Sequence, residues 1–117
     1  MNDTTPRVHK MNLNDAPFKL IKAGSKTVEM RLYDEKRQLL KTGDVIIFTN
    51  NMTEETLTVS VAGLYRYKDF TDLYAHHDKI SIGYLPQEKA EPGDMLLYYS
   101  EELIEKYGTL AIKIKLI

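Results

Sequence analysis

Short segments with a strand period are the feature that most constrains the fold of this chain. Apolar and polar residues alternate most clearly in Leu110–Leu116 and in Leu57–Tyr65. Successive side chains of a strand point to opposite faces, so this period indicates strands that cover a core with one face. Val8–Leu13 and Lys26–Tyr33 also fit strands, and Val45–Asn50, which is apolar on both parities, predicts a strand covered on both faces.

Between these segments the sequence predicts only short helices. Asn14 or Asp15 can cap a helix that has Pro17 in its first turn and ends at Gly24. The other helical or turn segments are Asp34–Leu40, Asp69–His77 and Glu101–Tyr107, the last of these capped by Ser100 and ended by Gly108. Ile80–Pro92 has the composition of a loop and could cover a cleft.

Together these elements predict an α+β architecture. About five to six strands, three to four short helices and few long crossovers favour a curled, mixed β-barrel over a doubly wound sheet. With 117 residues, of which 43% are apolar and 28% charged, the chain has the size and balance of one globular domain. We expect this domain to span residues 8–117, after a flexible polar tail of residues 1–7.

Composition excludes several classes of site. The chain has no cysteine, which rules out disulfides and thiolate-bound metal centres, and no metal or other cofactor is predicted. Met1–Lys10 lacks the apolar run of an export signal, and the longest apolar stretches are too short to span a bilayer. The sequence therefore predicts a cytoplasmic protein with no membrane contact.

Charge is unevenly distributed along the chain. The net charge of −1 argues against a protein that coats nucleic acid through bulk positive charge. However, residues 19–41 hold seven bases and three acids, a net charge of +4, whereas residues 88–105 hold one base and six acids, a net charge of −5. A local basic patch of this kind could hold a phosphate or a short oligonucleotide, but charge alone favours an ordinary solvated surface.

The segment 26–33 carries the most specific functional signal. Its alternation puts Thr27, Glu29 and Arg31 on one face and apolar side chains on the other, with Lys26 at the rim beside the turn that begins at Gly24. A hydroxyl, a carboxylate and a guanidinium on one face can converge on a polar ligand. The simpler interpretation is an exposed strand with a surface ion pair between Glu29 and Arg31.

This segment is part of a longer motif that matches a known family. The motif runs Pro17-Phe18-x-x-Ile21-x-x-Gly24-x-Lys26-Thr27-x-Glu29-x-Arg31 and continues as Asp34-x-Lys36-Arg37-x-x-Leu40-x-x-Gly43-Asp44-x-Ile46-x-Phe48. With His9-x-Met11 before it and Tyr98-Tyr99-Ser100-x-Glu102 near the end, the chain resembles the ASCH domain family. The resemblance implies a β-barrel of the pseudouridine-synthase-associated (PUA-like) type, with a cleft beside the barrel that binds RNA or a nucleotide.

The same resemblance offers a catalytic alternative. Some small bacterial members remove the acetyl group of N4-acetylcytidine with a lysine in the Gly-x-Lys-Thr motif, a threonine three residues later and a distal carboxylate. Lys26 matches that lysine, Glu29 stands where those enzymes carry the threonine, and Asp78 is only a loose counterpart of the carboxylate. If the protein is an enzyme, its catalytic residues would be Lys26 and Glu29, and whether it is one stays open.

The leading hypothesis is therefore a module that binds RNA or a nucleotide-like ligand. In it, lysine and arginine clamp phosphate, Glu29 reads a polar edge of the ligand, and tyrosines stack on a base. The predicted ligand-binding residues are Lys26, Thr27, Glu29, Arg31, Arg37 and Tyr98. The alternatives are a small amidohydrolase acting on an N4-acylated cytidine nucleoside, with Lys26 central, and a protein-binding adaptor that uses the acidic stretch 100–105. The sequence leaves the natural ligand and the oligomeric state open.

The histidines carry a weaker signal. Adjacent imidazoles rarely bind one ion together, so His76 and His77, with Asp78, indicate a surface helix end. His9 shares the parity of Met11 and Leu13, which favours a histidine bonded within the core, or one that lines the cleft.

Overall fold

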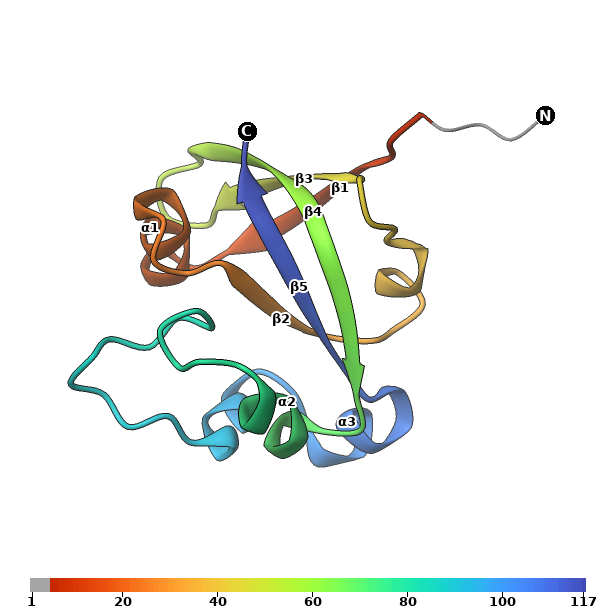
Figure 1. The fold of residues 1–117 in the computed structure, drawn as a ribbon, viewed down its shortest axis with the longest axis vertical. Helices are drawn as coiled ribbons and strands as arrows, with labels where there is room; N and C mark the ends of the chain where they lie inside the picture. The colour runs from red at the N-terminus through yellow and green to blue at the C-terminus, as the bar shows by residue number, and fades with distance from the viewer. Residues whose placement is uncertain (1–4) are drawn as a thin grey trace.

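The computed structural model describes residues 5–117, and its centre is one curved sheet of five strands (Figure 1). The strands are β1 (Val8–Leu13), β2 (Val28–Leu32), β3 (Val45–Asn50), β4 (Thr56–Tyr67) and β5 (Thr109–Leu116). Their order across the sheet is β1-β3-β4-β5-β2. β1 pairs in parallel with β3 and every other pair is antiparallel, so the sheet is mixed, as the sequence predicts.

Short helices occupy the connections between strands. They are α1 (Asp15–Ala23), α2 (Phe70–His76) and α3 (Glu101–Tyr107), with 3₁₀ helices η1 (Arg37–Leu39) and η2 (Pro92–Leu97). α1, α2 and α3 match the predicted helices to within about two residues at each end. The side chains of Asp69 and Ser100 cap the starts of α2 and α3 by accepting from the amides of Asp72 and Leu103.

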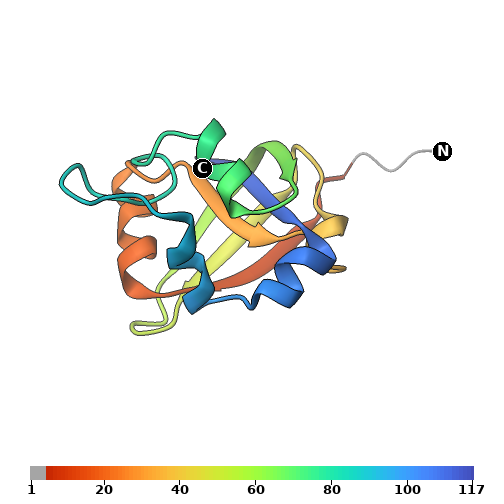
Figure 2. The same ribbon diagram turned by 90° about the horizontal axis from the view of Figure 1, so that it is seen from below.

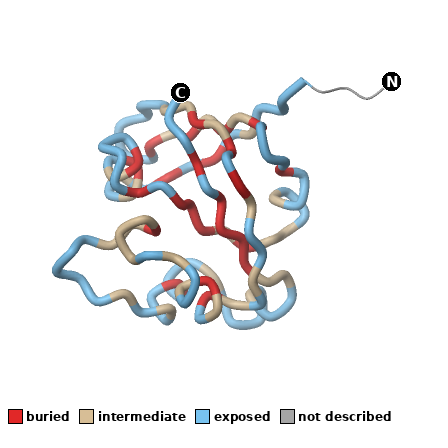
Figure 3. The backbone as a smooth tube through the Cα atoms, viewed as in Figure 1, coloured by how far each residue is buried: buried red, intermediate tan, exposed pale blue. Residues whose placement is uncertain are grey.

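The buried residues, red in Figure 3, form two clusters. Leu110 and Ala111 are adjacent on β5 and belong to different clusters, so the clusters lie on opposite faces of the sheet. The concave face holds the larger core, in which Phe18 and Ile21 of α1 pack against Phe48 of β3 and Ile112 of β5. The other face packs against α2, η2 and α3, which lie together at one end of the sheet (Figure 1). Both faces of β2 are therefore buried, which explains why four of its five residues are inaccessible to solvent.

The sheet curls into a half-barrel whose two edge strands, β1 and β2, face each other across an open seam. No ladder of backbone hydrogen bonds joins these edges among the described residues. Side chains bridge them instead: Nη2 of Arg31 donates to the carbonyl of Asn12 at 2.8 Å, and Nζ of Lys36 donates to the carbonyl of Lys10 at 3.4 Å. The fold class predicted from the sequence is confirmed, as a half-barrel whose open seam is bridged by side chains.

Two details differ from the sequence-based expectations. The strand predicted over 26–33 is shorter, because Thr27 and Val28 donate their amides to the carbonyl of Ser81 in a neighbouring loop. β3 is fully buried on one face only, and its other face is half-buried. Of the predicted tail 1–7, residues 1–4 lie outside the described residues, while Arg7 exchanges hydrogen bonds with Asp44 and Val45.

Candidate functional site

A cleft of about 820 Å³ opens at the seam between β1 and β2. One wall comes from α1 and the end of β1, and the opposite wall comes from the loop that follows α2 and from η2. Figures 1 and 2 both place the 78–91 loop on the same side of the molecule as α1. The cleft therefore lies where the sheet edges separate, which is a usual place for a ligand site.

Three charged side chains from β2 and the turn before it form the floor of the cleft. Glu29 lies between two cations: its Oε1 is 3.1 Å from Nζ of Lys26, and its Oε2 is 2.8 Å from Nη2 of Arg31 and accepts from Nε at 2.9 Å. Lys26 is only 6% exposed and Glu29 only 4%. Isolated surface ion pairs have neither this burial nor this linkage, so the exposed-strand interpretation of the segment is wrong.

The turn after α1 and the 78–91 loop together bury Lys26. Gly24 ends α1 in the left-handed conformation, with φ of 89°, and the amide of Lys26 then donates to the carbonyl of Leu20. From the loop, the carbonyl of Ile82 accepts from Nζ of Lys26 at 3.1 Å. A Cβ on Gly83 would lie 3.3 Å from that Nζ, so the loop backbone rests directly on the ammonium. The expectation that Lys26 sits at the rim is therefore wrong, because this loop covers it.

The floor has a net positive charge. Burial by itself raises the pKa of Glu29, but the charges of Lys26 and Arg31 and their hydrogen bonds outweigh burial and hold the pKa below its ordinary value. Glu29 is thus an anion with a cation on each side. Lys26 has three N–H donors and Arg31 five, and their contacts with described residues leave one donor of Lys26 and Nη1 of Arg31 for a ligand.

Tyrosines dominate the wall opposite α1. Tyr74 of α2, Tyr84 of the loop, and Tyr98 and Tyr99 after η2 all line the cleft. The Tyr84 hydroxyl donates to Oδ2 of Asp94 at 2.7 Å and lies 2.9 Å from the Tyr74 hydroxyl, so Tyr74 donates to Tyr84 in turn. Burial, followed by these bonds, raises the pKa of Tyr84 far above its ordinary value. Tyr84 therefore stays neutral, and the four tyrosines line the cleft with aromatic rings and hydroxyls.

The structure brings together four of the six predicted ligand-binding residues. Lys26, Glu29 and Arg31 line the cleft floor, and Tyr98, which is 62% exposed, stands at its wall. Thr27 is outside this cleft: its side chain lines a separate, smaller cavity between α1 and β5. Arg37 is not part of the cleft lining, and its guanidinium pairs with Asp34 at 3.4 Å.

The histidines and Asp78 have other partners. His9 Nε2 lies 2.9 Å from Oδ2 of Asp44, away from the cleft lining. His77 Nε2 lies 2.9 Å from the Tyr67 hydroxyl, and Asp78 accepts from the amide of Ile80. The described residues contain no group of three or more possible metal ligands, and no helix among residues 5–117 has the length and apolarity to cross a membrane.

Sequence reasoning missed three parts of the site. They are the carbonyl of Asn12, the carbonyl of Ile82 and the backbone of Gly83. Backbone groups carry no side-chain signature, and both carbonyls are distant in sequence from the residues that they contact. Only the Gly83 position has a sequence signal, because a glycine inside a predicted loop indicates a special backbone conformation, and its φ is 114°.

The ASCH domain model matches residues 11–117 of this chain. The chain belongs to the ASCH domain family. Its half-barrel is thus an α+β, PUA-like fold, and the resemblance drawn from the Gly-x-Lys-Thr-x-Glu-x-Arg motif is confirmed. A search of curated proteins finds no match to this ASCH domain.

Solved structures of similar proteins agree with this assignment. The crystal structure of the hypothetical protein PH0355 is 36% identical, with a TM-score of 0.82, and the match covers 94% of this chain and 99% of that one. The solution structure of protein PF0455 from Pyrococcus furiosus is 34% identical, with a TM-score of 0.72, covering 94% and 97%. A mutant of ZmASCH from Zymomonas mobilis shares the fold at 14% identity, with a TM-score of 0.67, covering 93% and 68%.

Proposed function

We propose that this ASCH domain binds one unpaired nucleotide, as part of an RNA or as a free nucleotide-like ligand, in the cleft at the seam. The observation that supports this most is the linked trio of buried Lys26, buried Glu29 and partly exposed Arg31 at the floor of an otherwise largely apolar, tyrosine-lined cleft. A nucleotide combines an aromatic ring with an anionic group, and the cleft offers aromatic faces above a cationic floor. Its volume of about 820 Å³ suits a ligand of that size.

Each residue then has a distinct role. Arg31 and Lys26 donate their free N–H groups to a phosphate or to a carbonyl oxygen of the base. Both oxygens of Glu29 already contact the two cations, so we assign Glu29 the positioning of those cations rather than the reading of a base edge. Tyr98, exposed at the wall, is the tyrosine best placed to stack on the base from the solvent side.

The catalytic alternative requires chemistry that the floor does not favour. A lysine that acts as a base needs an accessible amine, but Nζ of Lys26 is already held by the Glu29 carboxylate at 3.1 Å and by the carbonyl of Ile82 at 3.1 Å. Among the described residues, the lining also contains no serine, threonine, cysteine or histidine that could serve as a nucleophile or proton carrier. We therefore favour a binding function over a deacylating enzyme.

Isothermal titration calorimetry with the four nucleoside 5′-monophosphates tests the proposal. We expect at least one to bind, and Arg31→Ala to weaken that binding at least tenfold, because charge-assisted hydrogen bonds to the ligand are lost. The matched control is Arg66→Ala, which removes an exposed arginine that stacks on Tyr33 outside the cleft. Absence of binding to the wild-type protein, or equal affinity in Arg31→Ala, contradicts the proposal.

Incubation with N4-acetylcytidine, followed by chromatography, distinguishes the binding function from the amidohydrolase alternative. Binding without release of acetate supports the binding module. Turnover that disappears in Lys26→Met would instead establish the amidohydrolase.

A further inference from the structure

A second surface with nucleic-acid chemistry lies on the outside of the sheet, away from the cleft. β4 and β5 contain no acidic residue, and the exposed Lys113 and Lys115 of β5 share its outer face, although the whole chain has a net charge of −1. Arg66 of β4 pairs with Leu110 and lies on the opposite face. In Figure 1, α2 and α3 lie at one end of these two strands, and no helix of the described part of the chain crosses their other end. Lys113 and Lys115 are both exposed, so this part of the outer face is a basic surface that solvent reaches.

An exposed tyrosine ring lies over Gly63, beside these lysines. Tyr65 is 45% exposed, and a Cβ added to Gly63 would lie only 2.9 Å from its hydroxyl oxygen and 3.0 Å from its ring. Gly63 and Tyr65 are two residues apart and so share a face, and the register irregularity between Val61 and Gly63 lies at this point. The missing side chain at Gly63 is thus the space that the Tyr65 ring occupies.

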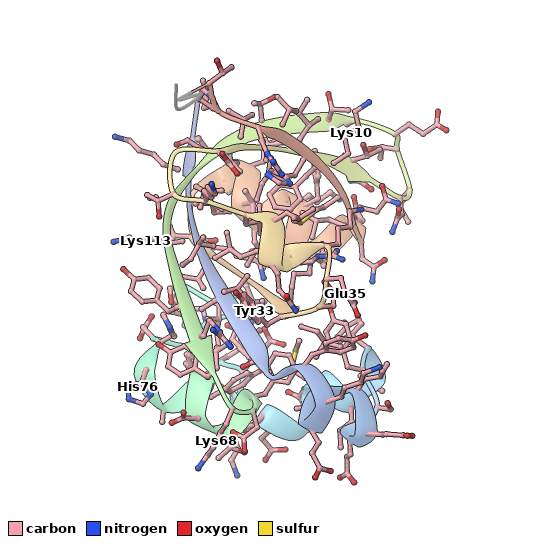
Figure 4. The ribbon with its side chains drawn as sticks, turned by 90° about the vertical axis from the view of Figure 1, so that its right-hand side faces the viewer. Lys10, Tyr33, Glu35, Lys68, His76 and Lys113 are labelled. Carbon is pink, nitrogen blue, oxygen red and sulfur yellow. The ribbon has the colours of Figure 1, made fainter. Side chains whose placement is uncertain are left out.

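Neighbouring groups fix the ring and supply charge beside it. The imidazole of His77 meets the Tyr65 ring edge-on, with centroids 5.9 Å apart, and is itself held by the Tyr67 hydroxyl at 2.9 Å. Lys113 pairs directly with Gly63 across the strands, so its side chain emerges beside the Tyr65 ring. Figure 4 shows Lys113 and His76 projecting from the same side of the molecule.

We propose that this surface, built from Gly63, Tyr65, His77, Lys113 and Lys115, binds an unpaired segment of nucleic acid outside the cleft. A base stacks on the exposed face of Tyr65, and the flanking phosphates lie against Lys113 and Lys115. Stacking is available to any base, so this contact is tolerant of sequence. It does not depend on the cleft, because the two sites share no residue.

Fluorescence anisotropy with fluorescein-labelled, 12-nucleotide oligo(A) and oligo(U) RNA, and with the same DNA sequences, tests the surface. We expect Tyr65→Ala to weaken binding by roughly 5- to 100-fold, and Tyr65→Phe to stay within about twofold of the wild-type protein. Lys113→Ala with Lys115→Ala should reduce the slope of log affinity against log salt by about 1 to 2. The RNA and DNA arms show whether the 2′-hydroxyl contributes.

Gly63→Ala is the sharpest variant, because it keeps every aromatic and charged group. Its new Cβ must displace the Tyr65 ring, so we expect it to weaken binding nearly as much as Tyr65→Ala. Matched controls outside the surface are Tyr107→Ala, whose hydroxyl contacts Glu35, and Lys89→Ala with Lys106→Ala. These should bind as the wild-type protein does.

The outcomes separate this surface from the cleft. Wild-type affinity in Tyr65→Ala and Gly63→Ala overturns the proposal, even if Arg31→Ala loses binding of mononucleotides. Loss in the lysine variants alone also overturns it, since it would leave only an electrostatic contact without a stacking platform. Failure of the wild-type protein to bind any of the oligonucleotides contradicts it outright.

Discussion

Glu29 is the residue on which the cleft floor depends. It is buried and ionised, and each of its oxygens contacts a different cation. Without the carboxylate, Lys26 and Arg31 would be two like charges in a poorly solvated site. The negative charge at position 29 thus stabilises the fold and aims the two donors into the cleft.

Stability should fall at acidic pH because of two carboxylates. The pKa of Glu29 is lowered as described, and that of Asp44 is lowered because hydrogen bonds from His9 and the amides of Lys41 and Arg7 outweigh the effect of burial. A lowered native pKa means that the unfolded chain binds protons more readily, so these groups stabilise the fold above about pH 4 to 5 and lose that effect as the pH falls below it. Thermal denaturation between pH 7 and pH 3 measures this loss of stability, which should be smaller in Asp44→Asn than in the wild-type protein. An equal loss in the two proteins would contradict the role of Asp44.

Gly83→Ala should damage the cleft although it replaces no charged residue. Its φ of 114° is unfavourable for alanine by about 1–2 kcal/mol, and the new Cβ would press on the end of Lys26. We expect a lower midpoint of urea denaturation and weaker nucleotide binding. Gly93→Ala is the control, because a Cβ there would meet open space; equal behaviour of the two variants would show that the loop does not position Lys26.

At the scale of elements, the 78–91 loop is the part that completes the cleft. It is fixed at one end by the carbonyl of Ser81, which accepts from the start of β2, and at the other by the bond from Tyr84 to Asp94 of η2. Tyr74 of α2 joins the same chain of hydroxyls. Three elements therefore hold one loop in place over Lys26.

Tyr84→Phe should loosen this loop and leave the sheet intact. The change removes the hydrogen bond to Asp94 and the acceptor for Tyr74, each worth about 1 kcal/mol. Hydrogen–deuterium exchange should become faster at the amides of Ile82, Gly83 and Tyr84. Tyr107→Phe is the control: it removes a hydroxyl bonded to Glu35 on the surface and should not change exchange in the loop. Unchanged exchange in Tyr84→Phe as well would show that the Tyr84 hydroxyl does not hold the loop in place.

Local pattern predicted most of the elements but little of how they meet. The strand period of Leu110–Leu116 and the caps Ser100 and Gly24 depend on neighbours in sequence, and the structure confirms those elements. The placement of Lys26 depends on Ile82, 56 residues away, and no periodicity encodes that contact. For the same reason the shared parity of Thr27 and Glu29 did not place both in the cleft: the strand begins only at Val28.

At the scale of the whole molecule, the seam between β1 and β2 is bridged by a side chain and also holds the cleft. Exposed strand edges invite unwanted pairing, and here the guanidinium of Arg31 covers part of the β1 edge by its bond to Asn12. The contacts of Arg31 with Glu29 and Asn12 thus give this part of the family motif a structural role. Under the proposed function, the same residue also binds the ligand.

Arg31→Met should show how much the contacts of Arg31 at the seam stabilise the fold. It keeps the apolar stem but removes the bonds to Glu29 and Asn12, leaving the buried carboxylate with Lys26 alone. We expect a loss of about 2 kcal/mol in the free energy of unfolding, measured by urea denaturation. Arg66→Met, which removes an exposed cation 4.0 Å above the ring of Tyr33, should lower the free energy of unfolding by less than about 1 kcal/mol. Equal losses in the two variants would contradict the stabilising role of Arg31 at the seam.

The most direct measurement of the central claim is an NMR titration of the ¹⁵N-labelled protein with whichever nucleoside 5′-monophosphate binds. The account predicts the largest amide shift changes at Glu29 and Arg31 on β2 and at Ile82 and Gly83 in the covering loop. Changes confined to the outer surface around Tyr65 and Lys113, or no saturable change with any of the four nucleotides, would contradict a nucleotide site in the cleft.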